Sequence, residues 1–335
     1  MNDSKVSLSI IIAAPPETLE PGSLLSLQRL ERLSDGVEII VARGRMPSVQ
    51  RNQAAQQARG KWLWFLDDDS LVSEQTLVAL KSWLQRTDAD GVGGPSLCPA
   101  QASFVQRVFA VVMSSFLAFG PSRARYLRVG LARPSGEKEL ILCNLLIRRD
   151  CFFNHGGFDE MLYPNEENAL LESMARGGSR LWYDPILSVD RLPRQNLVAF
   201  LRMIFRYGTG RAQQIRRHSA SGSLLNVMPS LFSLYLWSLL IAMCFSGLQG
   251  DGWIWLILLT PLLSLILASL GECLVQMRHH PRVACLLAWW LIPCSLLAYG
   301  HGFIAGFLGR ACSPEARQNK LDVELEIPPS RMTGA

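Results

Sequence analysis

Residues 62–70 read WLWFLDDDS, and this stretch decides how the first part of the chain is interpreted. Four apolar residues, 63–66, run directly into three consecutive carboxylates, Asp67, Asp68 and Asp69. A short apolar run of this kind predicts a buried strand. Three adjacent negative charges at the end of a buried strand need a cation, hydrogen-bond donors or open water. What stabilises these three negative charges therefore has to be identified.

Similar apolar runs alternate with amphipathic segments on both sides of this stretch. The expected strands cover residues 7–14, 37–42, 63–66 and 91–94, and the expected helices cover residues 24–33, 48–58 and 74–85. This alternation predicts an α/β fold in which helices pack on both faces of a mostly parallel sheet. Ligands of such sheets bind beyond the carboxyl ends of the strands, so the position of the acid triplet predicts a site.

The composition points to a membrane. Of the 335 residues, 49% are hydrophobic and only 18% are charged, which is too apolar for an ordinary soluble domain. The net charge is +5, and the chain also contains long apolar segments. This combination indicates binding to an anionic membrane surface or to a phosphate-bearing substrate. We expect no nucleic-acid partner. The eight cysteines contain no C-x-x-C spacing and are expected to be packed free thiols.

Three long stretches in the last third of the chain contain no charged residue. They are residues 224–248, 252–271 and 283–300. Each is long enough to cross a hydrocarbon core of about 30 Å as a helix. The pattern predicts about three transmembrane helices, and a buried helical domain is the alternative.

Basic residues predict the orientation. They precede the first stretch or separate the second from the third: Arg202, Arg206, Arg211, Arg216, Arg217, Arg278 and Arg282. Because cytoplasmic loops are enriched in Lys and Arg, we expect a multi-pass protein of the bacterial inner (plasma) membrane with its catalytic domain on the cytoplasmic face. Three crossings put the tail after Arg310 outside. A hairpin or re-entrant path over residues 299–308 returns the tail to the cytoplasm, and the sequence leaves both open.

A fourth apolar stretch covers residues 104–120 and carries Arg107. A single crossing here would move the following segment to the other side of the membrane. We therefore expect a helix that lies on the bilayer surface, with Arg123, Arg125 and Arg128 near phosphate headgroups. An ordinary core helix is the alternative.

An Asp-x-Asp pattern at a strand end suits a divalent cation, because Mg²⁺ and Mn²⁺ prefer oxygen ligands and often share them with substrate phosphates. A second interpretation is structural. Asp69 and Ser70 are also suitable caps for the expected helix, with Glu74 in its first turn.

Several segments together resemble a known family. SIIIAAPPE (9–17), EIIVARGRMPSVQRNQAAQQARGKWLWFLDDDS (38–70) and GGFDE (156–160) resemble the family-2 glycosyltransferases of the GT-A fold. RQNLVAFLRMIFRYGTGR (194–211), followed by apolar stretches, is similar to the membrane-bound exopolysaccharide branch of succinoglycan type. The resemblance implies a Rossmann-like nucleotide-sugar-binding domain at 1–195, a basic interfacial segment at 196–222, transmembrane helices at 223–310 and a polar tail at 311–335.

The resemblance also implies the donor site. Ala14 and Glu17 match the family's pattern after the first strand, and Arg51-Asn52 matches an Arg-Asn pair at the start of the next helix. At the end of the second strand the family usually has an Asp that reads the base, and here Ala42-Arg43 stands instead. The metal motif maps to the acid triplet. Asp69 and Asp67 are expected to hold Mg²⁺ or Mn²⁺, and Asp67 and Asp68 are expected to lie near the nucleotide.

On the acceptor side, Glu166 and Glu167 occupy the place of the family's catalytic Glu-Asp pair. Glu167 aligns with the Asp and is the expected general base. Asp159, after Gly156-Gly157-Phe158, either orients the acceptor hydroxyl or closes a turn, and Cys143-Asn144 is a further candidate for the acceptor side. Arg206 lies in a partial match to the interfacial pattern of processive synthases and is expected to contact a donor or lipid diphosphate, or to reach lipid headgroups.

The sequence therefore predicts a membrane-anchored inverting glycosyltransferase. The expected donor is a nucleotide sugar, and the expected acceptor is a polyprenyl-diphosphate-linked saccharide of surface or exopolysaccharide synthesis. Two alternatives remain. One is a polyprenyl-phosphate glycosyltransferase similar to dolichyl-phosphate mannose synthases, and the other is a non-catalytic membrane scaffold of the same fold.

Overall fold

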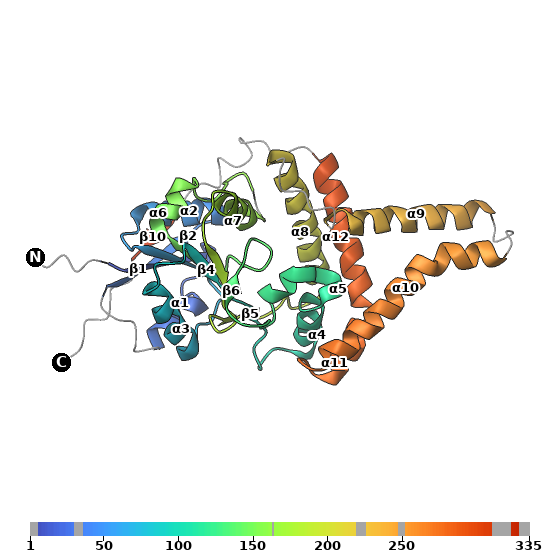
Figure 1. Ribbon diagram of the computed structural model, residues 1–335, viewed down its shortest axis with the longest axis horizontal. Helices are drawn as coiled ribbons and strands as arrows, with labels where there is room; N and C mark the ends of the chain where they lie inside the picture. Colours follow the sequence, from blue (N-terminus) through green and yellow to red (C-terminus); the bar gives the residue numbers. More distant parts are fainter. Residues whose placement is uncertain are drawn as a thin grey trace, which may run out of the picture. The chain divides into compact units, whose positions relative to one another are not determined.

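The computed structural model describes residues 6–29, 36–162, 164–218, 226–246, 252–309 and 323–327. The chain divides into two compact units. The sheet unit comprises Met1–Pro99, Ala124–Leu192 and Cys312–Ala335, and the helical unit comprises Ala100–Arg123 and Pro193–Ala311. Figure 1 shows the elements of both units.

The sheet unit is built on one eight-stranded sheet with the order β10-β2-β1-β3-β7-β4-β8-β6. The bounds of these strands are β1 Leu8–Ala14, β2 Val37–Arg43, β3 Trp62–Asp67, β4 Gly91–Gly93, β6 Arg133–Pro134, β7 Asn144–Arg148, β8 Leu181–Tyr183 and β10 Glu324–Glu326. Strand β1 pairs in parallel with β2 and β3, whereas β7, β6 and β10 are antiparallel to their neighbours. A second sheet contains β5 (Ser96–Leu97) and β9 (Val189–Asp190).

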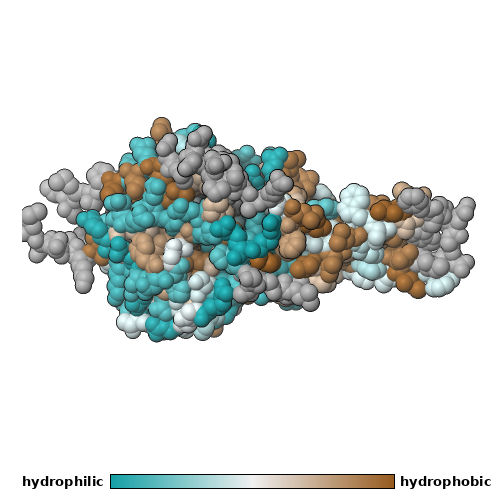
Figure 2. All heavy atoms as spheres, turned by 90° about the horizontal axis from the view of Figure 1, so that it is seen from above, coloured by the Kyte–Doolittle hydropathy of each residue, from teal (hydrophilic) through white to brown (hydrophobic). Residues whose placement is uncertain are grey.

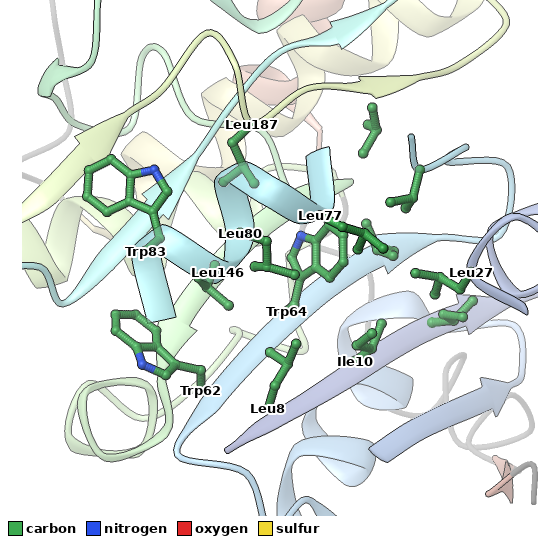
Figure 3. Packing of buried hydrophobic residues seen from close by; sticks show 14 of the residues in the cluster. Leu8, Ile10, Leu27, Trp62, Trp64, Leu77, Leu80, Trp83, Leu146 and Leu187 are labelled. Atoms are coloured by element: carbon green, nitrogen blue, oxygen red, sulfur yellow. The ribbon is translucent and has the colours of Figure 1, made fainter. Parts of the chain in front are cut away.

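Helices pack on both faces of the large sheet. On one face, α1 (Gly22–Arg29) and α3 (Glu74–Leu84) cover a cluster in which Trp64 and Leu80 are buried (Figure 3). On the other face, α2 (Pro47–Gln57), α6 (Arg149–Asn154) and α7 (Glu166–Arg176) contribute to a second cluster. Every side chain from Trp62 to Leu66 is buried because β3 lies inside the sheet with helices on both sides.

The predicted α/β architecture is confirmed, but the expectation of a mostly parallel sheet is wrong: the sheet is mixed, with three parallel and four antiparallel strand pairs among the described residues. All four expected strands and all three expected helices are present, with ends that differ by a few residues. Helix α1 ends at Arg29, and the expected continuation to residue 33 lies outside the described residues. The antiparallel strand β7 between β3 and β4 was not predicted, since its apolar run gives no sign of direction.

The helical unit contains the apolar stretches. Its helices are α4 (Phe104–Met113), α5 (Phe116–Phe119), α8 (Leu197–Arg217), α9 (Met228–Ser246), α10 (Gly252–Gln276), α11 (Arg282–Ala288) and α12 (Leu291–Leu308). A 3-10 helix, η1 (Gly120–Arg125), connects α5 with the sheet unit. In Figure 1, α9 and α10 project from the remaining helices of this unit, and α8 lies beside α12.

Among the described residues, α10 over Leu256–Gln276 and α12 are long and apolar enough to cross a membrane. Helix α4 and the segment after it form a third candidate, bent by 57°. The third predicted stretch, 283–300, is divided between α11 and α12 by a break at Trp289 and Trp290. On the face seen in Figure 2, the projecting part of the helical unit carries hydrophobic and weakly polar residues.

Candidate active site

The acid triplet lies where β3 leaves the sheet. Strands β1, β2 and β3 are parallel and end at one edge, at Ala14, Arg43 and Asp67. The Ser70 backbone amide donates to the Asp67 carbonyl at 3.1 Å, which turns the chain directly after the strand. Helix α3 is capped by Ser73. The alternative in which Asp69 or Ser70 caps this helix is therefore wrong.

Arg191 binds two members of the triplet. It follows β9, which an isolated bridge between Leu71 and Asp190 fastens to the chain just after the triplet. Its Nη1 lies 3.0 Å from Asp67 Oδ2, and its Nε lies 2.6 Å from Asp69 Oδ1. One guanidinium thus pairs with the first and third carboxylates. Arg191 therefore neutralises part of the negative charge of the triplet.

Arg51 joins the triplet to the Glu166-Glu167 pair. This side chain of α2 is 5% exposed. Its Nη2 lies 2.6 Å from Asp67 Oδ1, and its Nη1 lies 3.2 Å from Glu166 Oε1. Arg51 is therefore a buried bridge between the expected donor and acceptor residues.

The side chain of Gln50, the residue before Arg51, fixes the position of α2. Gln50 Nε2 donates to the Ala14 carbonyl at 2.8 Å and to the Ala42 carbonyl at 2.6 Å. Because these carbonyls lie at the ends of β1 and β2, the start of α2 is held at the same sheet edge as the triplet.

The middle carboxyl group, Asp68, lies in an environment with excess negative charge from Asp67 and Asp69. Burial, together with the charges of Asp69 and Asp67, raises the pKa of Asp68 to about 6 against the opposing effect of Arg191. The triplet is thus only partly neutralised by protein cations. A further cation would lower the electrostatic energy of this turn.

The residues fit a divalent cation that shares its shell with phosphates. Mg²⁺ bound in this way needs only one or two carboxylates from the protein. Asp69 offers a side chain that is 47% exposed, whereas Asp67 is 18% exposed and carries two arginines. In the described part of the chain, no three His, Cys, Asp or Glu residues are grouped as a ready metal site. Metal binding by Asp69 and Asp67 stays a prediction.

Glu166 and Glu167 begin α7, and both are buried. Burial raises the pKa of Glu166, and the neighbouring Glu167 charge raises it further, while Arg51 opposes the shift. Glu167 has a different partner: its Oε1 lies 3.6 Å from Arg125 Nη1. The two carboxylates consequently occupy different electrostatic environments, as expected for two carboxylates with separate roles.

The backbone in front of this pair is strained. Asn165, the cap residue of α7, has a φ of 95°, which makes it the one described non-glycine residue in the left-handed region. Its side-chain Nδ2 is buried and has no hydrogen-bond partner among the described residues. Strain of this kind gathers at functional sites because only a well-fixed surrounding structure maintains it.

Asn52 holds the Gly-Gly-Phe turn. Its Oδ1 accepts from the Phe158 amide at 3.0 Å, and its Nδ2 donates to the Phe158 carbonyl at 2.9 Å. Gly157 has a φ of 71°, and a Cβ there would lie 3.0 Å from Asn52 Oδ1. Asp159 accepts from the Met161 amide at 2.9 Å, which is the turn-closing interpretation of this residue. Roles of Asn52 and Asp159 in ligand binding stay predictions.

Arg43 stands where the family has its base-reading Asp, and it has a structural task. It donates to the Leu19 carbonyl at 2.7 Å and to the Thr18 carbonyl at 3.2 Å, and it pairs with Glu326 of β10. Glu17 is exposed and lies 2.5 Å from Arg45. No direct equivalent of the missing Asp is therefore identified at the end of β2.

Two other candidates, Arg206 and Asn144, lie in different environments. Arg206 belongs to α8 of the helical unit and is exposed, so its predicted contact with a diphosphate stays a prediction. Asn144 is fully buried, accepts from Trp64 Nε1 at 3.0 Å and donates to the Leu187 carbonyl at 2.6 Å. Both ends of its amide hold the core, which speaks against a contact between Asn144 and the acceptor.

Sequence reasoning missed Arg191 as a partner of the acid triplet. It placed Arg125 near lipid headgroups, whereas the structure places this mostly buried side chain beside Glu167. Arg191 is the first residue after a two-residue strand, and Arg125 ends a 3-10 helix. No motif marks either position. The only available signal was the unpaired charge of the acid triplet, which required partners somewhere in the chain.

Three comparisons bear on this site. The family model "Glycosyl transferase family 2" matches residues 22–151, which include α2, the acid triplet and β7. The succinoglycan biosynthesis protein ExoA of Rhizobium meliloti (strain 1021) is 30% identical over 146 residues. That match covers 42% of this chain and 42% of ExoA, so the chain spans about two fifths of the curated relative's length.

A solved structure shares the fold. The mannosyltransferase PcManGT from Pyrobaculum calidifontis, in complex with GDP-Man and Mn²⁺, superimposes with a TM-score of 0.53 and 14% identity. The superposition covers 90% of this chain and 87% of PcManGT. The match to the glycosyl transferase family 2 model therefore covers residues 22–151, and the superposition shows that the chain shares the fold of PcManGT.

Proposed function

We propose that this protein transfers a sugar, with inversion, from a nucleotide-sugar donor to a lipid-linked saccharide at the cytoplasmic face of a bacterial plasma membrane. The observation that carries the proposal is the Arg51 bridge. It connects Asp67 of the acid triplet with Glu166, next to the expected base. A site of this kind has a group for the leaving diphosphate and a group for the attacking hydroxyl within one network.

The donor half is assigned to the sheet edge. Arg51 and Arg191 supply positive charge beside the triplet, which favours a diphosphate. Ala14, Glu17 and Asn52 are proposed to lie along the nucleotide. Asp69, with Asp67, would hold Mg²⁺ or Mn²⁺, and the bound cation supplies charge neutralisation for a departing nucleoside diphosphate. PcManGT with its Mn²⁺ supports this assignment by its fold.

Glu167 is proposed as the general base. Its carboxylate takes the proton of the acceptor hydroxyl while that oxygen forms a bond to the anomeric carbon and the bond to the nucleoside diphosphate breaks. Arg125, at 3.6 Å, orients the carboxylate. Glu166 is proposed to position Arg51 and, through it, Asp67. A single displacement with one base inverts the anomeric centre.

The proposal of a lipid-linked acceptor rests on the apolar helices of the helical unit. Helices α10 and α12 are apolar enough for a bilayer, and a water-soluble acceptor would not need them. A polyprenyl-diphosphate-linked saccharide combines a membrane-bound lipid with a sugar hydroxyl. The name of the relative ExoA supports a place in exopolysaccharide synthesis.

Mass spectrometry of lipid products tests the proposal. Membranes that contain the wild-type chain are incubated with nucleotide sugars, with Mn²⁺ or EDTA, and with either a polyprenyl-diphosphate saccharide or bare polyprenyl phosphate. The proposal predicts a lengthened saccharide in the presence of Mn²⁺, and no product from Asp69→Ala or Glu167→Gln. Transfer to bare polyprenyl phosphate supports the first alternative. Inertness of the wild type with all common donors supports the scaffold.

A further inference from the structure

The tail strand belongs to the catalytic sheet. Strand β10 pairs antiparallel with β2, with Leu325 opposite Ala42 and Glu326 opposite Val41. Glu326 pairs with Arg43, and Leu325 packs against the hydrophobic cluster that contains Ala42. Because one folded sheet lies on one side of a membrane, the chain between β9 and β10 must cross the bilayer an even number of times.

The same reasoning applies to α4 and α5. They lie in sequence between β5 and β6, and both strands belong to the sheet unit. A single crossing by this bent pair would separate the two strands across the bilayer. The pair therefore makes no net crossing, as both the predicted surface helix and its core-helix alternative require.

Helix α12 lies against α8 with backbone contact along its length. A Cβ on Gly302 would lie 2.0 Å from the Phe205 carbonyl oxygen, and one on Gly208 would lie 2.2 Å from the Tyr299 carbonyl oxygen. Thr209 Oγ1 donates to the Gly302 carbonyl at 3.0 Å. Small residues allow this approach, and any path of α12 through a bilayer would carry α8 along with it.

The contacts between α8 and α12 continue to the C-terminal ends of both helices, and residue numbers increase in the same direction along both. Arg216, in the last turn of α8, donates to carbonyls at the end of α12, at Gly306 over 3.4 Å and at Gly309. The two helices therefore run side by side in parallel (Figure 1).

Helix α8 is poorly suited to cross a bilayer. It carries Arg202, Arg206, Arg211, Arg216 and Arg217. Four of these five arginines are exposed, and Arg211 is partly exposed. Arginines on a lipid-exposed helix are costly in hydrocarbon but favourable beside anionic phosphate headgroups. The pair α8–α12 therefore fits the interface, and α12 does not provide a crossing.

Helices α9 and α10 have the opposite properties. Both lie in stretches with long uncharged runs, and they project from the rest of the helical unit (Figure 1). Helix α9 has 19 residues and α10 has 25, which correspond to about 28 and 37 Å as helices. Both lengths are close to or above a hydrocarbon thickness of about 30 Å, and two crossings are an even number.

We infer that α9 and α10 are the crossing helices of the described chain, and that α8 and α12 together form a platform bound to the anionic headgroups of the same leaflet. The tail strand then lies on the same side as the catalytic sheet. This inference does not depend on the proposed reaction.

Sidedness of single cysteines tests the number of crossings. In a full-length chain without its native cysteines, we place one cysteine at Gln75, Trp253 or Glu324, and treat sealed inverted and right-side-out vesicles with a membrane-impermeant maleimide. Gln75 reports the catalytic sheet, and Trp253 reports the start of α10. We expect Gln75→Cys and Glu324→Cys to react in the same vesicles and Trp253→Cys in the opposite ones. Reaction of Glu324→Cys together with Trp253→Cys overturns the inference.

Depth along α12 tests the platform independently. Cys294 alone, or Leu308→Cys in the cysteine-free chain, is labelled with a fluorophore in vesicles of phosphatidylglycerol and phosphatidylethanolamine that contain lipid quenchers at known depths. The two positions are 14 residues apart, about 21 Å along a helix. A platform predicts shallow, similar depths for both labels, within about 5 Å. A depth difference near the full helical length overturns it, even if the sidedness result agrees.

Discussion

Arg191 Nε lies 2.6 Å from Asp69 Oδ1, and Asp69 is the residue expected to contact the metal. The same guanidinium reaches Asp67. An arginine therefore lies beside the carboxylate that a divalent cation would use. The two cations compete for Asp69, and this competition can be measured without turnover.

Replacing Arg191 by Ala should tighten the binding of Mn²⁺ to the nucleotide-free protein. Removal of one positive charge in contact with Asp69 and Asp67 should raise the affinity by about tenfold, equal to ~1.4 kcal/mol. Titration followed by electron paramagnetic resonance of free Mn²⁺ measures the change. Arg176→Ala, at an exposed position of α7, is the matched control. Equal affinity in both variants contradicts the assigned metal position.

Loss of the Arg51 side chain should destabilise the sheet unit. Arg51→Met leaves the buried Glu166 and the mostly buried Asp67 without their shared partner, so we expect a loss of about 3–5 kcal/mol in the free energy of unfolding. Denaturant unfolding followed by tryptophan fluorescence measures it. The double variant Arg51→Met with Glu166→Gln should recover part of the loss, because it also removes the buried carboxyl group that has lost Arg51. A single-variant loss under about 1 kcal/mol would show that the bridge is not a major contact.

Glu166 should make stability depend on pH. Burial, aided by the Glu167 charge, raises its pKa above the ordinary 4.5, so the folded protein holds a proton that the unfolded chain releases at lower pH. The contribution is fully present below pH 4.5 and is lost as the pH rises through the raised pKa. Thermal unfolding midpoints between pH 5 and 9 should therefore fall less steeply in Glu166→Gln than in the wild type. Glu20→Gln, an exposed substitution, should keep the wild-type slope; parallel slopes in all three proteins contradict the shift.

Glu167→Gln should slow transfer by about 10²–10⁴-fold and leave donor binding within about threefold, because the amide cannot accept the proton. Glu167→Asp keeps the carboxylate but shortens the side chain by one methylene. Its transfer rate should therefore lie between those of the wild type and Glu167→Gln. Single-turnover product formation and donor titration measure the two effects separately. A Glu167→Gln enzyme with wild-type turnover would exclude this residue as the base.

The sheet was largely predictable because each strand is a short apolar run with helices on both sides. Residues 62–66 are buried on both faces and needed no partner information to be recognised as a strand. The direction of β7 and the addition of β10 depend on pairing partners far away in the sequence. Glu326 pairs with Arg43 across most of the chain, and local pattern contains no information about such a pair.

Part of the candidate site was predictable from motifs. Asp67 of the acid triplet, Arg51 and Glu166 form one network through contacts at 2.6 and 3.2 Å. Arg191 was not predictable, since it is placed by the bridge between Leu71 and Asp190. The membrane path was only partly predictable as well. Hydropathy marks α12 as a candidate span, while its glycine contacts with α8 come from tertiary packing.

Donor binding to the purified full-length protein tests the central claim most directly. Isothermal titration with a panel of nucleotide sugars, with and without Mn²⁺, is compared between the wild type, Asp69→Asn and the exposed control Asp88→Asn. We expect one donor to bind the wild type in the presence of Mn²⁺. Its affinity should be at least about tenfold lower for Asp69→Asn and unchanged for Asp88→Asn. Equal binding of the donor to Asp69→Asn and the wild type would contradict this expectation.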